Sequence, residues 1–411
     1  MKKALSLILA PVMVLSLCTC FASAETKEIT YVTLGDTGMA LLEEAAAEFE
    51  AETGVKVNLE SWSYSDAYQK ILTLAEAGNM PDAMYGFSSW TEQFMKAGWS
   101  VPFDGLISDE LYNDFSQAAR DVCSVDGKMW AMPSYMSVRS ELINKASFDA
   151  AGVEVPDTWE GLLEVAPKLC NDVTPYAYTM VAGHAKNTID CFLPILWAYG
   201  SDVLSADRQT VAFNTPEGVA ALQMYVDLAE YAEPGYGENT INETQSAFTT
   251  QTAAVYIHNG QGLAALEAAG ESHEWAEIID PLKGPGGEAY SYGVMDVDLM
   301  FATGNEEITA KFLELWHQAK YQGEVIKAAG WVPNQASYVE AIPAFSDPDN
   351  ALVAPFVAME GIAKFKPSIT CWEEIQKIMA DHVTNAVFGV ETAEEAWAAA
   401  ETECNAVLAA Q

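Results

Sequence analysis

Residues 29–59 alternate between the hydrophobic patterns of a strand, a helix and a second strand. The segment 29–34 (ITYVTL) is apolar and β-branched, which is typical of a strand. Apolar residues then recur at helical spacing over 39–53, and Gly54 ends that pattern. Residues 55–59 alternate apolar and polar side chains, which predicts another strand. This order predicts a β-α-β unit with a right-handed crossover, and therefore an α/β fold.

The same alternation continues to about residue 130. A helix is predicted over 66–77, where Asp66 and Gln69 fit a capping pattern. Residues 81–85 then predict a turn followed by a short strand. Because 411 residues are enough for two or three domains, this α/β unit is predicted to be one lobe of a larger molecule.

Helix start signals recur in the rest of the chain. Thr158, Thr215 and Thr392 each stand where the N-cap of a helix belongs, and Glu395 completes a capping box with Thr392. Residues 306–320 have the spacing of an amphipathic helix. The later part of the chain is therefore predicted to be rich in helices.

The N-terminus has the layout of a secretory signal peptide. Lys2 and Lys3 precede an apolar stretch over 4–21, and Ala22-Ser23-Ala24 resembles a cleavage site. No second stretch approaches membrane length. Cleavage after Ala24 predicts an exported protein, extracellular or periplasmic. The alternative is a lipoprotein tethered to the membrane through Cys20.

Acidic residues outnumber basic ones by 59 to 20, which gives a formal net charge of −39. Such a chain repels nucleic-acid phosphates and anionic membranes, so partners of these classes are excluded. Half of the residues are hydrophobic, which excludes global disorder. Two of the seven cysteines lie in the predicted signal peptide, and the other five are far apart in the sequence. They predict free thiols rather than a disulfide framework, with one bridge as the alternative.

The sequence carries no recognisable catalytic, metal-binding or phosphate-binding motif. It lacks HExxH, GxSxG, GxxxxGK[ST] and GxGxxG, and its five histidines show no metal-ligand spacing. Asp296 and Asp298 would share one face of a strand, as a pair of glycosidase carboxylates can. Among 59 acids such a pair is more often solvated or cleft-lining. The sequence therefore predicts a protein that is not an enzyme and needs no cofactor or metal.

Short motifs in a fixed order connect the chain to a known family. They are ITYVTL at 29–34, EFEAETGVKV at 48–57, GNMPDA at 78–83, DGKMWAMP at 126–133, INK at 143–145, PDTWE at 156–160, NTPEG at 214–218, WVP at 331–333 and FGV at 388–390. In this order the chain resembles the carbohydrate-binding extracellular solute-binding proteins of ABC importers, the maltose-binding-protein-like group. Two positions depart from the family pattern: Ile143 replaces a usual Tyr, and His258-Asn259-Gly260 stands where the family often has GxW.

The resemblance implies a type II periplasmic-binding-protein-like fold, with two α/β lobes joined by a hinge. Lobe one is expected over 27–133 plus 290–340, and lobe two over 138–288 plus 341–411. The break at 284–287 (GPGG) falls where a hinge is expected. The implied function is capture of a sugar between the lobes and its delivery, by a monomer, to membrane permease subunits. Ligand binding would stabilise the closed arrangement of the lobes.

Ligand-binding residues are expected on loops that face the interlobe cleft. Aromatic rings stack on the C–H faces of sugars, and polar side chains bind their hydroxyl groups. The candidates are Asp36, Thr37, Trp62, Tyr64, Asp66, Ser88, Tyr135, Arg139, Trp197, His258, Asn259, Tyr292, Asp296 and Trp331. Two alternatives remain open: an exported glycan-acting hydrolase, and a binding protein for another solute such as a polyamine. Carboxylates at Asp36, Asp66, Asp296 and Asp298 would suit a cationic solute.

Overall fold

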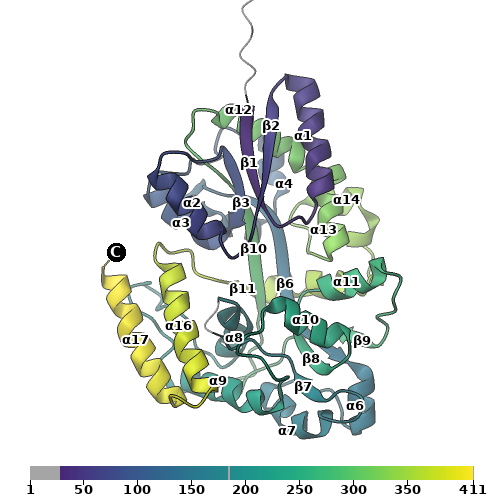
Figure 1. Cartoon of the computed structure of the whole chain (residues 1–411). Coiled ribbons are helices and arrows are strands. Elements are labelled where there is room, and N and C mark those ends of the chain that lie inside the picture. The colour runs from purple at the N-terminus through teal and green to yellow at the C-terminus, as the bar shows by residue number, and fades with distance from the viewer. Residues whose placement is uncertain (1–27, 184–185, 411) are drawn as a thin grey trace, which may run out of the picture.

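The computed structural model describes residues 28–183 and 186–410, and it is built around one mixed sheet (Figure 1). The strand order is β2-β1-β3-β10-β6-β8-β7, with β11 beside β10 and β9 beside β6. The predicted signal peptide, its cleavage site and Cys20 lie outside the described residues. No helix in the described part is both long and apolar enough to cross a membrane.

The predicted β-α-β unit is confirmed. Strand β1 (Glu28–Leu34) is followed by helix α1 (Met39–Thr53) and strand β2 (Lys56–Trp62), and the two strands pair in parallel. Gly54 ends α1 in the left-handed conformation, with φ 72° and its N–H donated to the Glu50 carbonyl. Strand β3 (Ala83–Phe87) pairs in parallel with the other edge of β1.

Helix α2 (Ala67–Glu76) is confirmed as an element, but its predicted cap is wrong. The Asp66 side chain does not cap the helix, because the residue has helical φ and ψ angles of −104° and −16°. Its carboxylate instead accepts hydrogen bonds from the Ser63 and Ser65 hydroxyls, at 2.9 and 3.1 Å. These nearby hydroxyl donors hold the carboxylate in the loop.

Two long strands run through both halves of the molecule. Strand β6 (Met132–Asn144) and strand β10 (Ser291–Met300) pair antiparallel with one another. On one side β10 pairs with β3, and on the other β6 pairs with β8 (Ala253–His258). Figure 1 shows both strands crossing the centre of the molecule, between its upper and lower halves. The sheet is therefore continuous from one lobe to the other.

The remaining elements surround these strands. In chain order they are α3 (Thr91–Lys96), α4 (Asp109–Asp114), α5 (Gln117–Val122), β4 (Ser124–Val125), β5 (Lys128–Met129), α6 (Lys145–Ala151), α7 (Trp159–Leu169), β7 (Tyr176–Tyr178), α8 (Lys186–Ala198), α9 (Pro216–Leu228), α10 (Ile241–Thr249), α11 (Gln261–Ala268), β9 (Ala276–Ile278), α12 (Glu306–Trp316), α13 (Glu324–Ala329), α14 (Ala336–Ala341), α15 (Ala354–Met359), β11 (Ala363–Phe365), α16 (Trp372–Val387) and α17 (Ala393–Ala409). A π-helical turn, η3, covers Ala319–Gly323, and short 3-10 turns include η1 (Ser88–Trp90). The predicted helix starts at Thr158, Thr215 and Thr392 are confirmed.

The buried apolar residues form two separate cores. The first lies around Tyr31, Phe94 and Phe312, and the second around Phe192 and Trp397. The lobe boundaries predicted from the sequence stay a prediction. Residues Leu352, Val353, Phe356 and Met359 pack into the first core although they follow residue 340.

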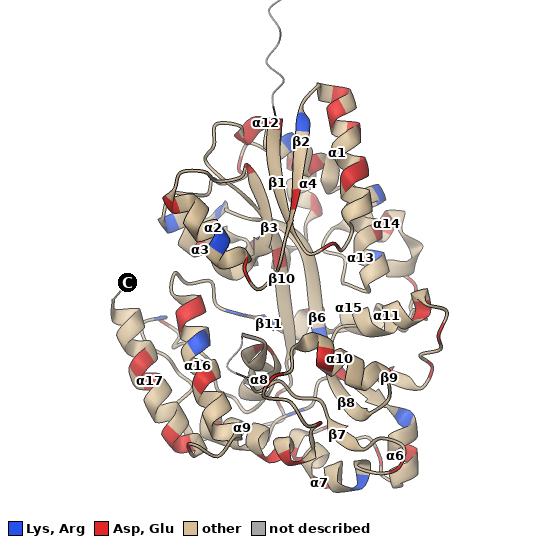
Figure 2. Ribbon diagram, in the orientation of Figure 1, with Lys and Arg blue, Asp and Glu red and all other residues tan. Residues whose placement is uncertain are grey.

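The acidic residues lie largely on the outer helices. Figure 2 shows Asp and Glu along α1, α16 and α17. On α1, for example, Glu43, Glu44 and Glu50 are exposed. A solvated acidic exterior accounts for the net charge without requiring a charged partner.

Candidate functional site

Five aromatic rings meet where β1, β2 and β3 end, and we call them the aromatic surface: Tyr64, Tyr85, Phe87, Tyr135 and Trp331. The ring of Tyr64 lies 6.5 Å from that of Tyr85 and 6.3 Å from that of Phe87. Tyr85 lies 5.4 Å from Tyr135, which lies 4.7 Å from Trp331. The surface thus joins a loop, a strand, a hinge strand and the segment after α13.

A bulge in β6 sets the direction of Tyr135. Along β10, Asp296 faces Tyr135 but Val297 faces Pro133, so Ser134 is the extra residue. Bulges re-aim neighbouring side chains and are frequent beside functional sites. Here the bulge lies immediately before a ring of the aromatic surface.

Asp296 lies against this surface from β10. The Tyr85 hydroxyl donates to its Oδ2 at 2.8 Å, inside the protein. Tyr64 is 43% exposed, yet the surrounding protein and then the Asp296 charge raise its pKa to about 12. Partial exposure combined with strong desolvation is what a residue on the wall of a cleft shows.

The loop after β1 lies beside Tyr64. Gly35 adopts φ 65°, and a Cβ atom there would approach the Tyr64 ring to 3.0 Å. The next residue, Asp36, is exposed and accepts a hydrogen bond from Ser61 at 2.9 Å. Thr37 is exposed as well. The structure therefore brings the candidates Asp36 and Thr37 to the rim of the aromatic surface.

Three other candidates in lobe one have different surroundings. Trp62 is buried, donates its Nε1–H to Glu60 at 2.8 Å, and has the Lys70 ammonium 3.7 Å above its ring. Asp66 is exposed and bound to serine hydroxyls. Ser88 is buried in η1, next to Phe87 in the chain. Their roles in binding stay predictions.

A second polar group lies at the lobe-two ends of the hinge strands. Arg139 on β6 stacks on Tyr292 of β10, with its guanidinium carbon 5.0 Å from the ring. The Tyr292 hydroxyl donates to Asp190 Oδ1 at 3.1 Å, and Lys366 Nζ lies 2.5 Å from the same oxygen. Trp197 lies 6.1 Å from the Tyr292 ring. This group unites three predicted candidates with Asp190 and Lys366.

Sequence reasoning missed Asp190 and Lys366. Asp190 is one of 59 acidic residues and lies in α8 without a motif. Lys366 precedes Pro367 and is one of only 20 basic residues, which was the available signal. The pairing of β11 with β10 brings Lys366 to this group, and the packing of α8 against β10 brings Asp190.

His258 and Asn259 lie next to β6 and form a buried relay. His258 donates Nδ1–H to Asn259 Oδ1 at 2.9 Å, and Asn259 donates to Ser137 Oγ at 2.7 Å. Burial, and then the charge of Arg139, lower the pKa of His258 well below its usual value. His258 is therefore a neutral residue at physiological pH.

A hollow of about 450 Å³ lies between the two halves of the molecule. Its walls include Ser88 and Glu92 from lobe one, and Arg208, Lys366 and Ser368 from lobe two. Arg208 Nη2 lies 3.1 Å from Glu92 Oε2, and the Glu92 N–H donates to Ser368 Oγ at 3.3 Å. The lobes are thus in direct contact beside the hollow.

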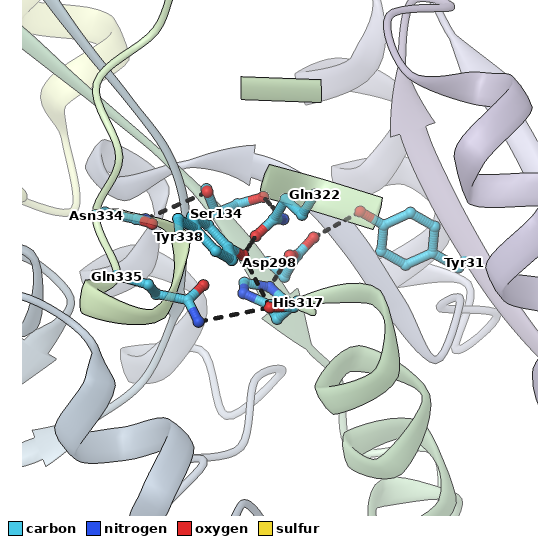
Figure 3. A network of polar contacts seen from close by, with 8 residues as sticks. All are labelled: Tyr31, Ser134, Asp298, His317, Gln322, Asn334, Gln335 and Tyr338. Carbon is cyan, nitrogen blue, oxygen red and sulfur yellow. Dashed lines mark hydrogen bonds and ion pairs between the residues drawn. The ribbon is translucent and has the colours of Figure 1, made fainter. Parts of the chain in front are cut away.

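Asp298 belongs to a buried network rather than to the cleft (Figure 3). The Tyr31 hydroxyl donates to its Oδ1 at 2.6 Å, and His317 Nε2 donates to its Oδ2 at 2.8 Å. Both side chains of the Asp298–His317 pair have zero exposure. An acid so enclosed cannot protonate a glycosidic oxygen in a cleft, which argues against the catalytic pair with Asp296.

The same network supports the aromatic surface from behind. Gln322, in the π-helical turn, donates to Ser134 Oγ at 2.8 Å, and Asn334 donates to the Ser134 carbonyl at 3.2 Å. Figure 3 shows Gln322, Asn334 and Tyr338 gathered around Ser134. The residue that forms the bulge before Tyr135 is therefore fixed by hydrogen bonds.

Known proteins share this architecture. The family model of bacterial extracellular solute-binding proteins matches residues 34–322. A protein of Brucella abortus (strain 2308), described as a binding protein, is 26% identical over 390 residues, covering 93% of each chain.

Two solved structures superimpose closely. One is an ABC transporter solute-binding protein of Thermotoga lettingae bound with α-D-tagatose, with a TM-score of 0.79, 21% identity and coverage of 93% of this chain and 100% of that one. The other is the maltose-bound MalE3 of T. maritima, with a TM-score of 0.80, 20% identity and coverage of 92% and 99%. Because the family model spans more than half of the sequence, the chain belongs to the bacterial extracellular solute-binding proteins.

Proposed function

We propose that this protein captures a sugar or short oligosaccharide between its two lobes and delivers it to the permease of an ABC importer. The observation that carries the proposal is the aromatic surface, with Asp296 at its side. Rings of this kind stack on the C–H faces of a sugar, while a carboxylate accepts hydrogen bonds from its hydroxyls. The bound tagatose and maltose of the two solved relatives support a saccharide.

Opening of the lobes belongs to this proposal. Tyr85, Tyr135 and Trp331 are almost fully buried here, whereas Tyr64 is not. A sugar would enter when the lobes separate, stack on the newly exposed rings and stabilise the closed arrangement. We also propose a monomer that acts outside the cytoplasm, with a lipid tether on Cys20 as the alternative to free release.

The test is a thermal-shift screen of the mature chain, residues 25–411, against neutral saccharides, acidic saccharides and polyamines. We expect a saccharide to raise the unfolding temperature reversibly and to be recovered unchanged. A response to polyamines alone would replace the sugar with a cationic solute. Release of monosaccharide from an oligosaccharide would instead support the hydrolase.

Two matched variants test the aromatic surface. Trp331→Ala should weaken saccharide binding by roughly ten-fold or more, because a stacked ring is lost. Trp275→Ala removes a tryptophan of α11–β9 that packs on Phe248, outside the aromatic surface. The affinity of the Trp275→Ala variant for the saccharide should stay within about two-fold of that of the parent protein. Equal affinity in both variants would contradict the assigned surface.

A further inference from the structure

Two basic side chains are mostly buried beside a single carboxylate at the lobe-two ends of the hinge strands. The side chains of Arg139 and Lys366 are 11% and 16% exposed, and that of Asp190 is 8% exposed. This is unusual for a chain with 20 basic and 59 acidic residues. Buried charges are costly unless each is paired and hydrogen-bonded, so the surplus cation needs an explanation.

The geometry gives the guanidinium of Arg139 too few hydrogen-bond acceptors among the described residues. Lys366 lies 2.5 Å from Asp190 Oδ1, whereas Arg139 Nη1 lies 4.0 Å from Oδ2, beyond hydrogen-bond distance. Arg139 Nε and Nη1 are both buried without an acceptor among residues 28–183 and 186–410. Stacking on Tyr292 occupies the face of the guanidinium and does not use these N–H groups.

The other titratable groups around Arg139 do not supply a negative charge. They are Tyr292, Cys191, Tyr256 and His258. Burial raises the pKa of Cys191 to about 12 and lowers that of His258 well below its usual value. Burial also raises the pKa of both tyrosines. Among the residues that the structure describes, the cations of Arg139 and Lys366 thus share the single carboxylate of Asp190, which leaves one positive charge in excess within this group.

Lys366 lines the interlobe hollow, where a solute can reach it. Ser88 and Ser368 offer hydroxyls in the same walls. Glu92 is paired with Lys96 at 2.7 Å and with Arg208 at 3.1 Å, which offsets its charge. The other two acids of these walls, Asp121 and Asp126, are exposed to solvent. Ser88 follows Phe87 of the aromatic surface directly, which places the hollow next to the proposed stacking rings.

We propose that the solute is an acidic sugar, whose carboxylate is bound by Arg139 and Lys366. This rests on the proposed function and names its substrate class. A uronic acid presents a C–H face for the aromatic surface and a carboxylate that supplies the missing negative charge. Charge-assisted hydrogen bonds to a carboxylate are stronger than those to a hydroxyl, so the acid group gives both affinity and selectivity.

The test compares digalacturonic and diglucuronic acids with their methyl esters by titration calorimetry. The ester keeps the sugar framework and removes only the charge. We expect the acids to bind at least about ten-fold more tightly than their esters, with a preference that weakens as salt is raised. Esters that bind as tightly as the acids would overturn the acidic-sugar inference and leave the proposed function standing.

Variants of the two basic residues test whether they bind the carboxylate of the sugar. Arg139→Gln and Lys366→Gln should each reduce the acid-to-ester ratio of affinities to roughly three-fold or less. Lys377→Gln, on the exposed face of α16, should leave the ratio unchanged. The ratio reports selectivity and does not shift when a variant is merely less stable. An unchanged ratio in both site variants would overturn their role, and failure of every saccharide to bind would overturn the proposed function itself.

Discussion

At the scale of single residues, Asp298 joins two elements of lobe one at a site closed to solvent. It accepts from Tyr31 of β1 and from His317 just after α12 (Figure 3). Buried carboxylates are stable only when such donors are present. The network therefore stabilises the packing on which β10, and with it Asp296, depends.

Removal of one donor should be costly. Tyr31→Phe leaves an oxygen of Asp298 short of a partner inside the protein, so the free energy of unfolding should fall by about 1–3 kcal/mol. Tyr68→Phe is the matched control, because its hydroxyl meets Gln93 at a half-buried site. Urea unfolding of both variants measures the difference, and similar losses would contradict the special role of Asp298.

A pH dependence follows from Glu141 on β6. Burial raises the pKa of its carboxyl to about 7, while the unfolded chain has an ordinary glutamate pKa. Between these values the folded protein holds the extra proton, so its stability falls as pH rises from about 4.5 to about 7. The contribution is on the order of 3 kcal/mol and is complete above that window.

Glu141→Gln removes this dependence. Relative to the variant, the parent should lose stability between pH 5 and pH 8, as measured by urea unfolding at each pH. Glu233, whose pKa burial also raises to about 7, is unchanged in the variant and cancels in the comparison. A difference that is constant with pH would refute the assignment.

The candidate site could be predicted only in part from the sequence. Tyr64, Tyr135 and Trp331 were recognised because aromatic residues stand in loop and strand-end positions. Asp190 and Lys366 were not, because their proximity depends on contacts of α8 and β11 with β10, which lie far apart in the chain. Hydrophobic patterns predict the conformation of residues that are neighbours in the chain. They do not predict contacts between distant segments.

At the scale of elements, N-cap residues in the sequence predicted the start of a helix correctly where the backbone angles let the side chain cap it. Thr158, Thr215 and Thr392 have extended backbones, and each accepts a hydrogen bond from the first turn of its helix. Asp66 has helical backbone angles and nearby serine donors, so the same kind of signal failed there. The cap depends on a backbone angle that a sequence motif does not specify.

The capping box of α17 provides a test. Thr392→Ala removes the bond to the Glu395 N–H and should lower the free energy of unfolding by about 1 kcal/mol. Thr402→Ala is the control within the same helix, since its hydroxyl bonds only the Ala398 carbonyl at an exposed site. It should be neutral or slightly stabilising, because alanine is the better helix former. Equal losses in thermal unfolding would reject the cap.

At the scale of the whole molecule, contacts between side chains join the lobes on one edge. Besides the pair of Glu92 and Arg208, Trp90 donates its Nε1–H to Glu373 of α16 at 3.0 Å. Arg208 also donates to the Ser368 carbonyl. These contacts favour the closed arrangement in addition to any ligand.

Arg208→Gln should therefore shift the molecule toward an open arrangement. A half-exposed ion pair is worth at most about 1 kcal/mol, so ligand affinity should weaken by up to roughly five-fold. Small-angle scattering of the ligand-free protein should show a larger radius of gyration. Lys377→Gln, which removes a pair within α16, should change neither quantity. An unaltered radius and affinity for Arg208→Gln would show that the contact does not bias closure.

The two hinge strands have a further consequence for cooperativity. Because β6 and β10 each pair within both halves of one sheet, neither half consists of a single stretch of chain. Loss of one core would strip hydrogen-bond partners from strands that the other core requires. Calorimetry of the ligand-free chain should accordingly show one heat-absorption peak, although there are two hydrophobic cores. We therefore expect the two lobes to unfold together in a single transition, although the proposed function requires them to move relative to one another.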